Sequence, residues 1–196
     1  MDPDKQLART EPSNVPDEYE REYMPGEGVV LYRDKTGSPW QLHAIFGAVA
    51  AMIVGSAVFD PAGWIAVALG LPLLGLVWLL FSILRVNVSQ GHVNVQLGLF
   101  GPKIPISAIE SVEARDYDWK EFGGWGIRVN TRGEWMYNLP GDGGRAVKIV
   151  WHDPKKGRRK VTWVASRHAD ELASSIERAQ AALPEGRKPP RELGEG

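Results

Sequence analysis

Two long apolar stretches follow each other in the chain, and neither contains a charged residue. Leu42–Phe59 has 18 residues and Pro61–Leu84 has 24. As helices, at about 1.5 Å per residue, they would extend ~27 and ~36 Å, close to the ~30 Å hydrocarbon core of a bilayer. A helix also satisfies its own backbone polar groups, which lipid cannot do. The pattern predicts a two-helix transmembrane hairpin over residues 42–84, turning at residues 60–63.

Two other interpretations of these stretches are weaker. A buried helical hairpin in a soluble protein would need a large apolar shell, and no other part of the chain is apolar enough to supply one. A signal peptide would lie at the N-terminus, whereas the first stretch begins at Leu42 and a second follows at once. Membrane-spanning helices are therefore the favoured interpretation.

Basic residues around the two stretches indicate their orientation. Arg33 and Lys35 precede the first stretch, Arg85 follows the second, and the connecting turn has no lysine or arginine. Because such residues are enriched on the cytoplasmic side, we expect a multi-pass protein with both termini in the cytoplasm. Trp40 and Trp64 lie where interfacial tryptophans are expected.

Small residues recur every four positions in the first stretch, at Gly47, Ala51 and Gly55. This spacing places them on one helix face, where a second helix can approach closely. Two partners fit: the other helix of the hairpin, or a second copy of the chain in a homo-oligomer. His43 lies near the start of the same stretch, beside Trp40, and is expected at the membrane interface.

Beyond Leu84 the apolar residues alternate with a period of two, which is typical of strands. Val86–Ser89 and His92–Leu97, on either side of a Gln-Gly turn, predict a β-hairpin. Pro105 marks the next short strand as an edge strand. Further strands are predicted at residues 109–114, 125–130, 135–138, 146–151 and 161–164. About seven short antiparallel strands at this spacing predict a small sandwich or barrel.

The last apolar pattern in the chain is helical. Ser166 is expected to cap the helix, and Pro184 ends it. The residues that share its apolar face are Leu172, Ile176, Ala179 and Leu183. The helix is predicted to cover the open end of the barrel. The expected fold is therefore a transmembrane α-helical hairpin followed by an all-β barrel or sandwich, residues 85–184, capped by a C-terminal α-helix.

Charge divides the chain into unlike parts. Residues 1–41 carry five Lys or Arg and nine Asp or Glu, whereas residues 85–196 carry 18 and 14. Residues 1–27 have almost no aliphatic side chains and are predicted to be a disordered acidic cytoplasmic tail. In the juxtamembrane segment 28–41, an apolar patch at residues 29–32 either docks near the membrane or adds a strand. Residues 185–196 are predicted to be a flexible tail.

A family resemblance lies in five runs of residues. They are Arg85–Leu97, Ile104–Val112, Phe122–Arg128, Gly144–Ile149 and Ala165–Ala173. Together they resemble bacterial membrane proteins with a bacterial pleckstrin-homology-like domain, over roughly residues 28–183. The resemblance implies seven strands with a C-terminal capping helix and a place in the bacterial plasma membrane. Lipid-binding pleckstrin-homology domains have several basic residues around the first hairpin loop, whereas the loop at residues 98–103 here has one lysine.

Candidate chemistry is sparse. The chain has no cysteine, which excludes disulfides, thiolate metal sites and cysteine nucleophiles. Its four histidines show no metal-binding spacing, and no phosphate-binding loop motif is present. Asp116, Asp118 and Glu121 predict a solvated acidic loop rather than an acid–base pair. We therefore expect no catalytic residue, metal or cofactor, and the net charge of −1 argues against nucleic-acid binding.

One basic cluster has a candidate role. It comprises Lys155, Lys156, Arg158, Arg159 and Lys160, all at a predicted hairpin tip. If the domain is held against the cytoplasmic leaflet, each cation near anionic lipid contributes about 1 kcal/mol before screening by salt. Two roles fit the cluster, a contact with anionic lipid headgroups and a solubilising turn.

Tryptophan is abundant, with eight in the chain and five in the strand-rich part. Most of these five are expected in the core, because aromatic residues dominate the packing of small barrels. An exposed pair, with Trp119 or Trp135 as candidates, is expected to mark a partner surface.

Two classes of function fit these features. A membrane-anchored, non-enzymatic interaction module would use the hairpin for location and the folded domain to bind a protein partner or membrane lipids. An accessory subunit of a membrane complex, in transport or envelope biosynthesis, would instead bind its partner through the helices.

Overall fold

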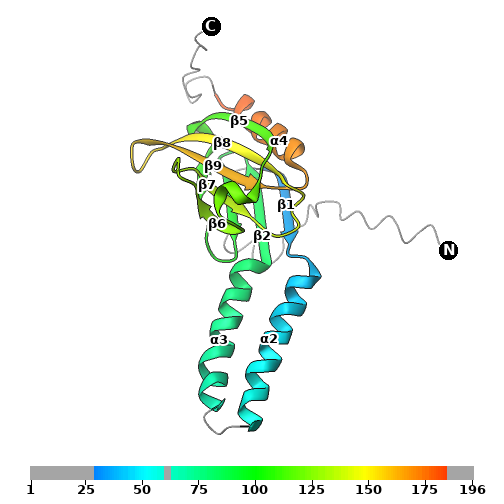
Figure 1. Cartoon of the computed structure of the whole chain (residues 1–196). Coiled ribbons are helices and arrows are strands. Elements are labelled where there is room, and N and C mark those ends of the chain that lie inside the picture. The colour runs from blue at the N-terminus through cyan, green and yellow to red at the C-terminus, as the bar shows by residue number, and fades with distance from the viewer. Residues whose placement is uncertain (1–28, 60–62, 185–196) are drawn as a thin grey trace, which may run out of the picture.

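The computed structural model describes residues 29–59 and 63–184. The predicted acidic tail, the turn after Phe59 and the C-terminal tail lie outside these residues. In the described part, two long helices extend together from one side of a β-rich domain, and a third helix packs on that domain (Figure 1).

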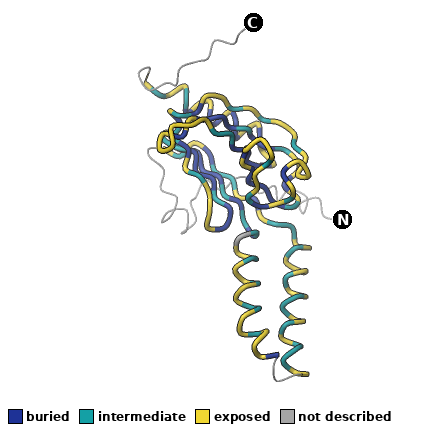
Figure 2. Tube along the Cα trace, turned by 60° about the vertical axis from the view of Figure 1, so that its left-hand side comes forward, coloured by how far each residue is buried: buried dark blue, intermediate teal, exposed yellow. Residues whose placement is uncertain are grey.

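The two long helices are α2 (Trp40–Phe59) and α3 (Gly63–Ser82), which run side by side. No residue of α2 is buried, and Figure 2 shows both helices outside the body of the domain. The predicted second stretch ends two residues too late, because Ile83 and Leu84 already belong to the following strand. The apolar pattern could not mark this change, since buried strands and apolar helices use the same side chains.

The first sheet is antiparallel, in the order β1-β2-β3-β4. Its strands are β1 (Val30–Gly37), β2 (Ile83–Ser89), β3 (His92–Leu97) and β4 (Lys103–Pro105). β4 is an edge strand, as Pro105 predicts. Of the two alternatives for the patch at residues 29–32, the added strand is confirmed, because β1 pairs with β2 from Val30 to Gly37. The helical hairpin is therefore inserted between two neighbouring strands of one sheet.

The second sheet has five strands in the order β5-β8-β9-β7-β6. They are β5 (Ile109–Asp116), β6 (Gly126–Val129), β7 (Trp135–Asn138), β8 (Arg145–Asp153) and β9 (Arg158–Ala165). Two short 3-10 helices, η2 (Ile106–Ala108) and η3 (Trp119–Phe122), precede β5 and β6.

The prediction of about seven antiparallel strands needs correction. In the part of the chain for which it was made, the described residues form eight strands, β2–β9, and β7 pairs with β9 in parallel, with Trp135 opposite Thr162. β9 lies between β8 and β7 in the sheet. It runs antiparallel to β8 and parallel to β7. Alternation of apolar and polar residues reveals each strand but not the order in which strands pair.

The core fills the space between the two sheets and the C-terminal helix α4 (Ala169–Ala181). Its fully buried members include Val88 and Val93 from the first sheet and Ile149 from the second. Burial of each such side chain contributes roughly 1.5–3 kcal/mol. The period-two pattern is confirmed here, because alternate residues of β2 and β3 point into this core.

Helix α4 closes one side of the domain. It contacts β5 and β8 of the second sheet and β1 and β2 of the first. Leu172, Ile176 and Ala179 are fully buried, as their spacing predicts. The predicted cap is wrong, because His168 is the N-cap residue and makes no side-chain capping bond. The Ser166 hydroxyl instead accepts the His168 N–H at 3.0 Å and donates to Asp34 of β1 at 2.6 Å.

Candidate functional site

The basic cluster at residues 155–160 lies in the turn between β8 and β9, as predicted, but two of its five cations are paired. Lys160 binds Asp153 at 2.5 Å and lies over the Trp151 ring, 5.2 Å from its centre. Arg159 binds Glu110 at 2.7 Å. The side chains of Lys155, Lys156 and Arg158 are exposed. The turn therefore offers at most three cations for an external contact without breaking internal bonds.

The position of this turn argues against the predicted headgroup contact. Figure 1 shows the β8–β9 turn projecting from the side of the domain, well above the ends of α2 and α3. A bilayer that enclosed the helices would not meet these cations unless the domain tilted strongly.

The small residues of α2 do not face α3. A Cβ atom added at Gly47 or Gly55 would have no neighbouring atom within 4 Å. The close approach lies instead at Gly70 of α3, where a Cβ atom would be 3.3 Å from Cδ1 of Ile53. Close packing of α2 on α3 through Gly47 and Gly55 is therefore wrong for the described chain, and for Ala51 it stays a prediction. The homo-oligomer, the other alternative, stays a prediction.

A polar pair joins α2 and α3 near the domain. The indole N–H of Trp78 donates to Nδ1 of His43 at 2.9 Å, and the rings meet edge to face with 6.0 Å between their centres. Accepting at Nδ1 places the proton of the neutral imidazole on Nε2. His43 lies in the first turn of α2, where an interfacial residue was expected. No local sequence pattern indicates the contact with Trp78, because the two residues are 35 positions apart.

The tryptophans divide differently from the prediction. Of the five in the strand-rich part, Trp151 and Trp163 are buried, whereas Trp119, Trp125 and Trp135 are exposed. Trp119 and Trp125 stack with 4.6 Å between ring centres, and both are 39% exposed. Lys120 lies over the Trp119 ring at 5.7 Å. The expectation that most of them are core residues is therefore wrong, and the sequence missed the pairing of Trp119 with Trp125.

Two glycines shape the backbone around this stacked pair. Gly123 ends η3 with a φ of 75°, a left-handed conformation that glycine adopts at no steric cost. Gly126 has a φ of 102° and lies against Phe81, in the last turn of α3. The glycine-rich run is thus a tight entry into β6, as predicted, and it brings this strand against α3.

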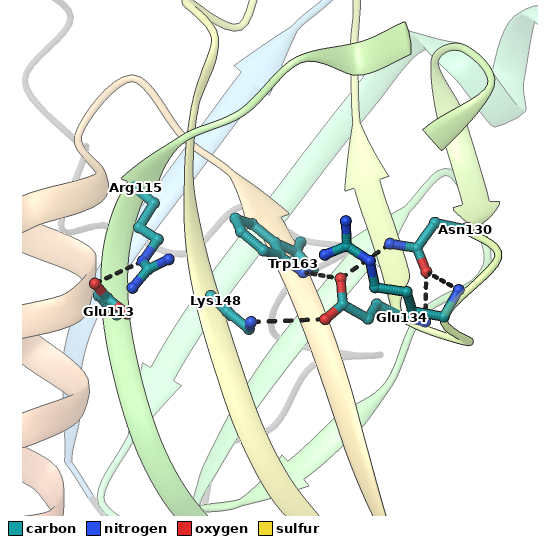
Figure 3. A network of polar contacts seen from close by, with 7 residues as sticks. Glu113, Arg115, Asn130, Glu134, Lys148 and Trp163 are labelled. Carbon is teal, nitrogen blue, oxygen red and sulfur yellow. Dashed lines mark hydrogen bonds and ion pairs between the residues drawn. The ribbon is translucent and has the colours of Figure 1, made fainter. Parts of the chain in front are cut away.

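Glu134, shown in Figure 3, is a buried carboxylate immediately before β7. It accepts the Asn130 side-chain N–H at 2.9 Å and the Trp163 indole N–H at 3.2 Å, and it lies 3.6 Å from the Lys148 ammonium. Burial alone raises the pKa of Glu134, but the bond from Asn130 and the charge of Lys148 outweigh it and lower this pKa. A carboxylate held in its ionised form in this way stabilises the β6–β7 turn and suits neither proton donation nor proton transfer.

Two other titratable groups in the domain have structural partners. The Tyr117 hydroxyl donates to Asp142, which also accepts the backbone N–H groups of Leu139 and Gly144. Burial and this bond raise the pKa of Tyr117. Burial also raises the pKa of Tyr137 to about 12. The bonds of Tyr117 and Asp142 fix the turn before β8.

The predicted acidic loop is solvent-exposed, as expected. Asp116 binds Arg145 at 3.3 Å, and Asp118 caps η3 by accepting the Lys120 N–H at 2.9 Å. Among residues 29–59 and 63–184, no three histidine, aspartate or glutamate side chains gather in a way that could hold a metal ion.

The outer face of the first sheet carries a row of polar residues across the strands. Arg33, Asn87 and Asn94 lie opposite one another, and so do Lys35, Arg85 and Gln96. Asn87 and Asn94 are buried. The three cations of this face lie on strands that lead directly into α2 or out of α3.

Comparison of the chain with known protein-family models, with curated proteins and with solved structures found no match in any of the three.

Proposed function

We propose that the protein is a membrane-anchored interaction module that acts by binding rather than by catalysis. In this proposal α2 and α3 span the membrane, and the β domain lies at the cytoplasmic leaflet, where it binds a protein partner or lipid headgroups. One observation carries the proposal: the chain extends two adjacent uncharged helices from a domain that already has its own complete core.

The dimensions and surface of the helices support this role. Each helix has 20 residues, which corresponds to about 30 Å, the thickness of a hydrocarbon core. α2 is long and apolar enough to cross a membrane, and α3 contains a shorter apolar stretch, Gly63–Leu79. Large side chains such as Met52, Phe59 and Leu69 are exposed along them. In water such a surface would be unfavourable, whereas in lipid it costs nothing.

The cations of the first sheet support the proposed sidedness. Arg33 and Lys35 lie on β1, just before α2, and Arg85 lies on β2, three residues after α3. They belong to the domain side of the hairpin, which basic residues assign to the cytoplasm. Both termini of the chain would then be cytoplasmic.

The junction between helices and domain supports a fixed position at the membrane. α3 passes into β2 without a linker, since Ser82 ends the helix and Ile83 begins the strand. The Ser38 N–H donates to the Ser82 carbonyl at 2.9 Å, and the Ser38 hydroxyl donates to the Phe81 carbonyl. A domain joined in this way has little freedom to move away from the bilayer.

A second candidate function is an accessory subunit of a membrane complex. The open side of α2 around Gly47 and Gly55 favours it, because a partner helix could approach closely there. The two functions differ in which part of the chain a partner needs. A partner that requires the β domain supports the interaction module, and one that binds residues 38–82 alone supports the subunit.

Membrane extraction tests the anchor itself. The full chain should remain in the pellet after alkaline carbonate washing and should float with vesicles in a density gradient. Because the chain has no cysteine, a single cysteine in place of Lys156 can report sidedness through an impermeant thiol reagent. In intact cells this position should be protected, and after permeabilisation it should be labelled. Recovery of the protein in the aqueous fraction without detergent would overturn the proposal.

A further inference from the structure

The edge of the β domain from which α2 and α3 leave carries large apolar side chains that are partly exposed. We call Leu99, Phe100, Trp119 and Trp125, together with Lys120, the membrane-proximal patch. Leu99 is 49% exposed and Phe100 is 58% exposed, while the two tryptophans are each 39% exposed. In a domain whose core is otherwise closed, side chains of this size in one region indicate a contact surface.

Backbone bonds fix the first half of this patch at the end of α3. The N–H of Gly98 donates to the carbonyl of Ile83 at 3.1 Å, and Ile83 is the first residue after the helix. Leu97 and Phe100 exchange two backbone hydrogen bonds, of 2.8 and 3.0 Å, which close a tight turn around Leu99. A side chain at Gly101 would overlap the carbonyl oxygen of Val95, so the chain folds back closely here. The turn therefore holds Leu99 and Phe100 rigidly at the level where the helix ends.

The second half of the patch is fixed to the same helix by a different contact. Trp125 immediately precedes Gly126, and a Cβ atom at Gly126 would lie only 2.5 Å from Cε1 of Phe81. Stacking of Trp119 on Trp125 brings a second indole to this level, with Lys120 over its ring. In Figure 1, β6 begins at the edge of the domain from which the helices leave. Both halves thus border the last turn of α3.

The composition of the patch fits one occupant, the boundary between lipid headgroups and acyl chains. Tryptophan is enriched at this depth because its ring is apolar while its N–H can bond to headgroups or water. Among the described residues, neither indole N–H of the stacked pair has a hydrogen-bond partner. Lysine beside them suits the phosphate level, where its stem lies along apolar surface and its ammonium reaches the headgroup.

We propose that the membrane-proximal patch inserts into the headgroup boundary of the bilayer that α2 and α3 span, and that it sets the orientation of the β domain on the membrane. This inference rests on the proposed membrane anchor. It assigns the lipid contact to residues 99–100 and 119–125 and not to the basic turn between β8 and β9. The surface of the domain opposite the patch is thereby presented to the cytoplasm.

Single-cysteine labelling of the full chain tests the insertion. A polarity-sensitive fluorophore is attached to Leu99→Cys, Lys156→Cys or Val54→Cys, and the protein is reconstituted into phosphatidylcholine vesicles with phosphatidylglycerol as a minor component. We expect blue-shifted emission at positions 54 and 99, quenched by phosphatidylcholine with a nitroxide near the headgroup at position 99, and water-like, unquenched emission at position 156. A membrane signal at position 54 with water-like emission at 99 would overturn the inference and leave the anchor intact. A water-like signal at position 54 would overturn both.

A second arm asks whether the two halves of the patch act together. With the fluorophore at Trp125→Cys, the double variant Leu99→Asp with Phe100→Asp should lose most of the quenching at position 125, because the charged turn lifts this edge of the domain from the lipid. Val129→Asp is a matched control, since Val129 is also exposed, at 47%, and lies at the far end of β6. It should leave the quenching unchanged. Equal quenching in the double variant and the unaltered chain would show that the patch does not orient the domain.

Discussion

Gly126 lies directly against Phe81, so the entry of strand β6 and the last turn of helix α3 share one van der Waals surface. The glycine has a φ of 102°, and an added Cβ atom would be 2.5 Å from the ring. This contact couples the second sheet to the helical hairpin, although Phe81 and Gly126 are 45 positions apart in the chain. It also gives a sharp test of how rigidly the domain is held.

Replacing Gly126 with alanine should destabilise the protein by about 1–3 kcal/mol from the strained φ and by about as much again from the overlap with Phe81. The measurement is urea denaturation of the full chain in detergent micelles. Gly133→Ala is the control, because Gly133 also has a positive φ, of 77°, but has no atom near the added Cβ. Equal losses of unfolding free energy in the two variants would show that the Phe81 ring moves aside at no cost.

Replacing Glu134 with glutamine should cost about 1–3 kcal/mol at neutral pH, because the variant loses a charge-assisted set of hydrogen bonds in a mostly buried place. The pKa of Glu134 is lower in the folded chain than in the unfolded chain. Its contribution is therefore complete above the unfolded pKa, about 4.3, and is lost as the pH falls through the folded value. The gap in unfolding free energy between the two proteins should narrow on acidification below pH ~4.

Glu113→Gln provides the comparison for that measurement. Glu113 pairs with Arg115 at 2.6 Å, but both side chains are about half exposed, so the pair should contribute less than about 1 kcal/mol. If both variants lost the same unfolding free energy with the same pH dependence, the buried network around Glu134 would contribute no more to stability than the exposed Glu113–Arg115 pair.

Removing the free cations of the basic turn should change neither stability nor membrane contact. In the triple variant Lys155→Gln, Lys156→Gln and Arg158→Gln, the bonds of Arg159 and Lys160 are kept. We expect lipid quenching of a fluorophore at position 99 to be the same as in the unaltered chain, because the turn lies far from the helix ends. A clear decrease in quenching would restore the headgroup contact predicted from the sequence.

Replacing Gly70 with leucine should loosen the helical hairpin, because its Cβ atom alone would lie 3.3 Å from Ile53. Overpacking of this kind costs about 1–3 kcal/mol. Gly47→Leu should leave the hairpin intact, since nothing lies within 4 Å of its added Cβ. Thermal unfolding in micelles checks the first effect. Chemical crosslinking of the Gly47→Leu protein tests whether a second copy of the chain packs on this face of α2. An oligomer that uses this face would dissociate in the variant, and its crosslinked product would be lost.

The sequence predicted those features that depend on local periodicity. The uncharged stretches located α2 and α3 to within two residues at each described end, and the spacing of Leu172, Ile176 and Ala179 located α4. The β2–β3 hairpin followed from alternation around Gln90-Gly91. In each case the side chains that must be buried together lie close in sequence, so one pattern contains the whole signal.

Features that depend on distant pairing could not be predicted. β1 finds its partner across both helices, and β9 lies between β8 and β7 through a parallel pairing that no local pattern encodes. The membrane-proximal patch combines residues 99–100 with residues 119–125, and only the folded chain brings both to the end of α3. The basic residues at positions 155–160 are recognisable in the sequence. Where their turn lies relative to the helices depends on how β8 and β9 are placed in the second sheet.

The insertion of α2 and α3 between β1 and β2 has a consequence for biogenesis. β1 leaves the ribosome before the helices, and its partner β2 leaves after them, so Gly37 cannot meet Ile83 until both helices have been synthesised and brought back together. Closing such a long loop in a flexible chain is entropically costly, whereas a hairpin already formed in lipid holds its two ends side by side. Under the proposed membrane anchor, correct insertion would thus act as a checkpoint: a chain that failed to enter the bilayer would leave β1 as an unpaired edge.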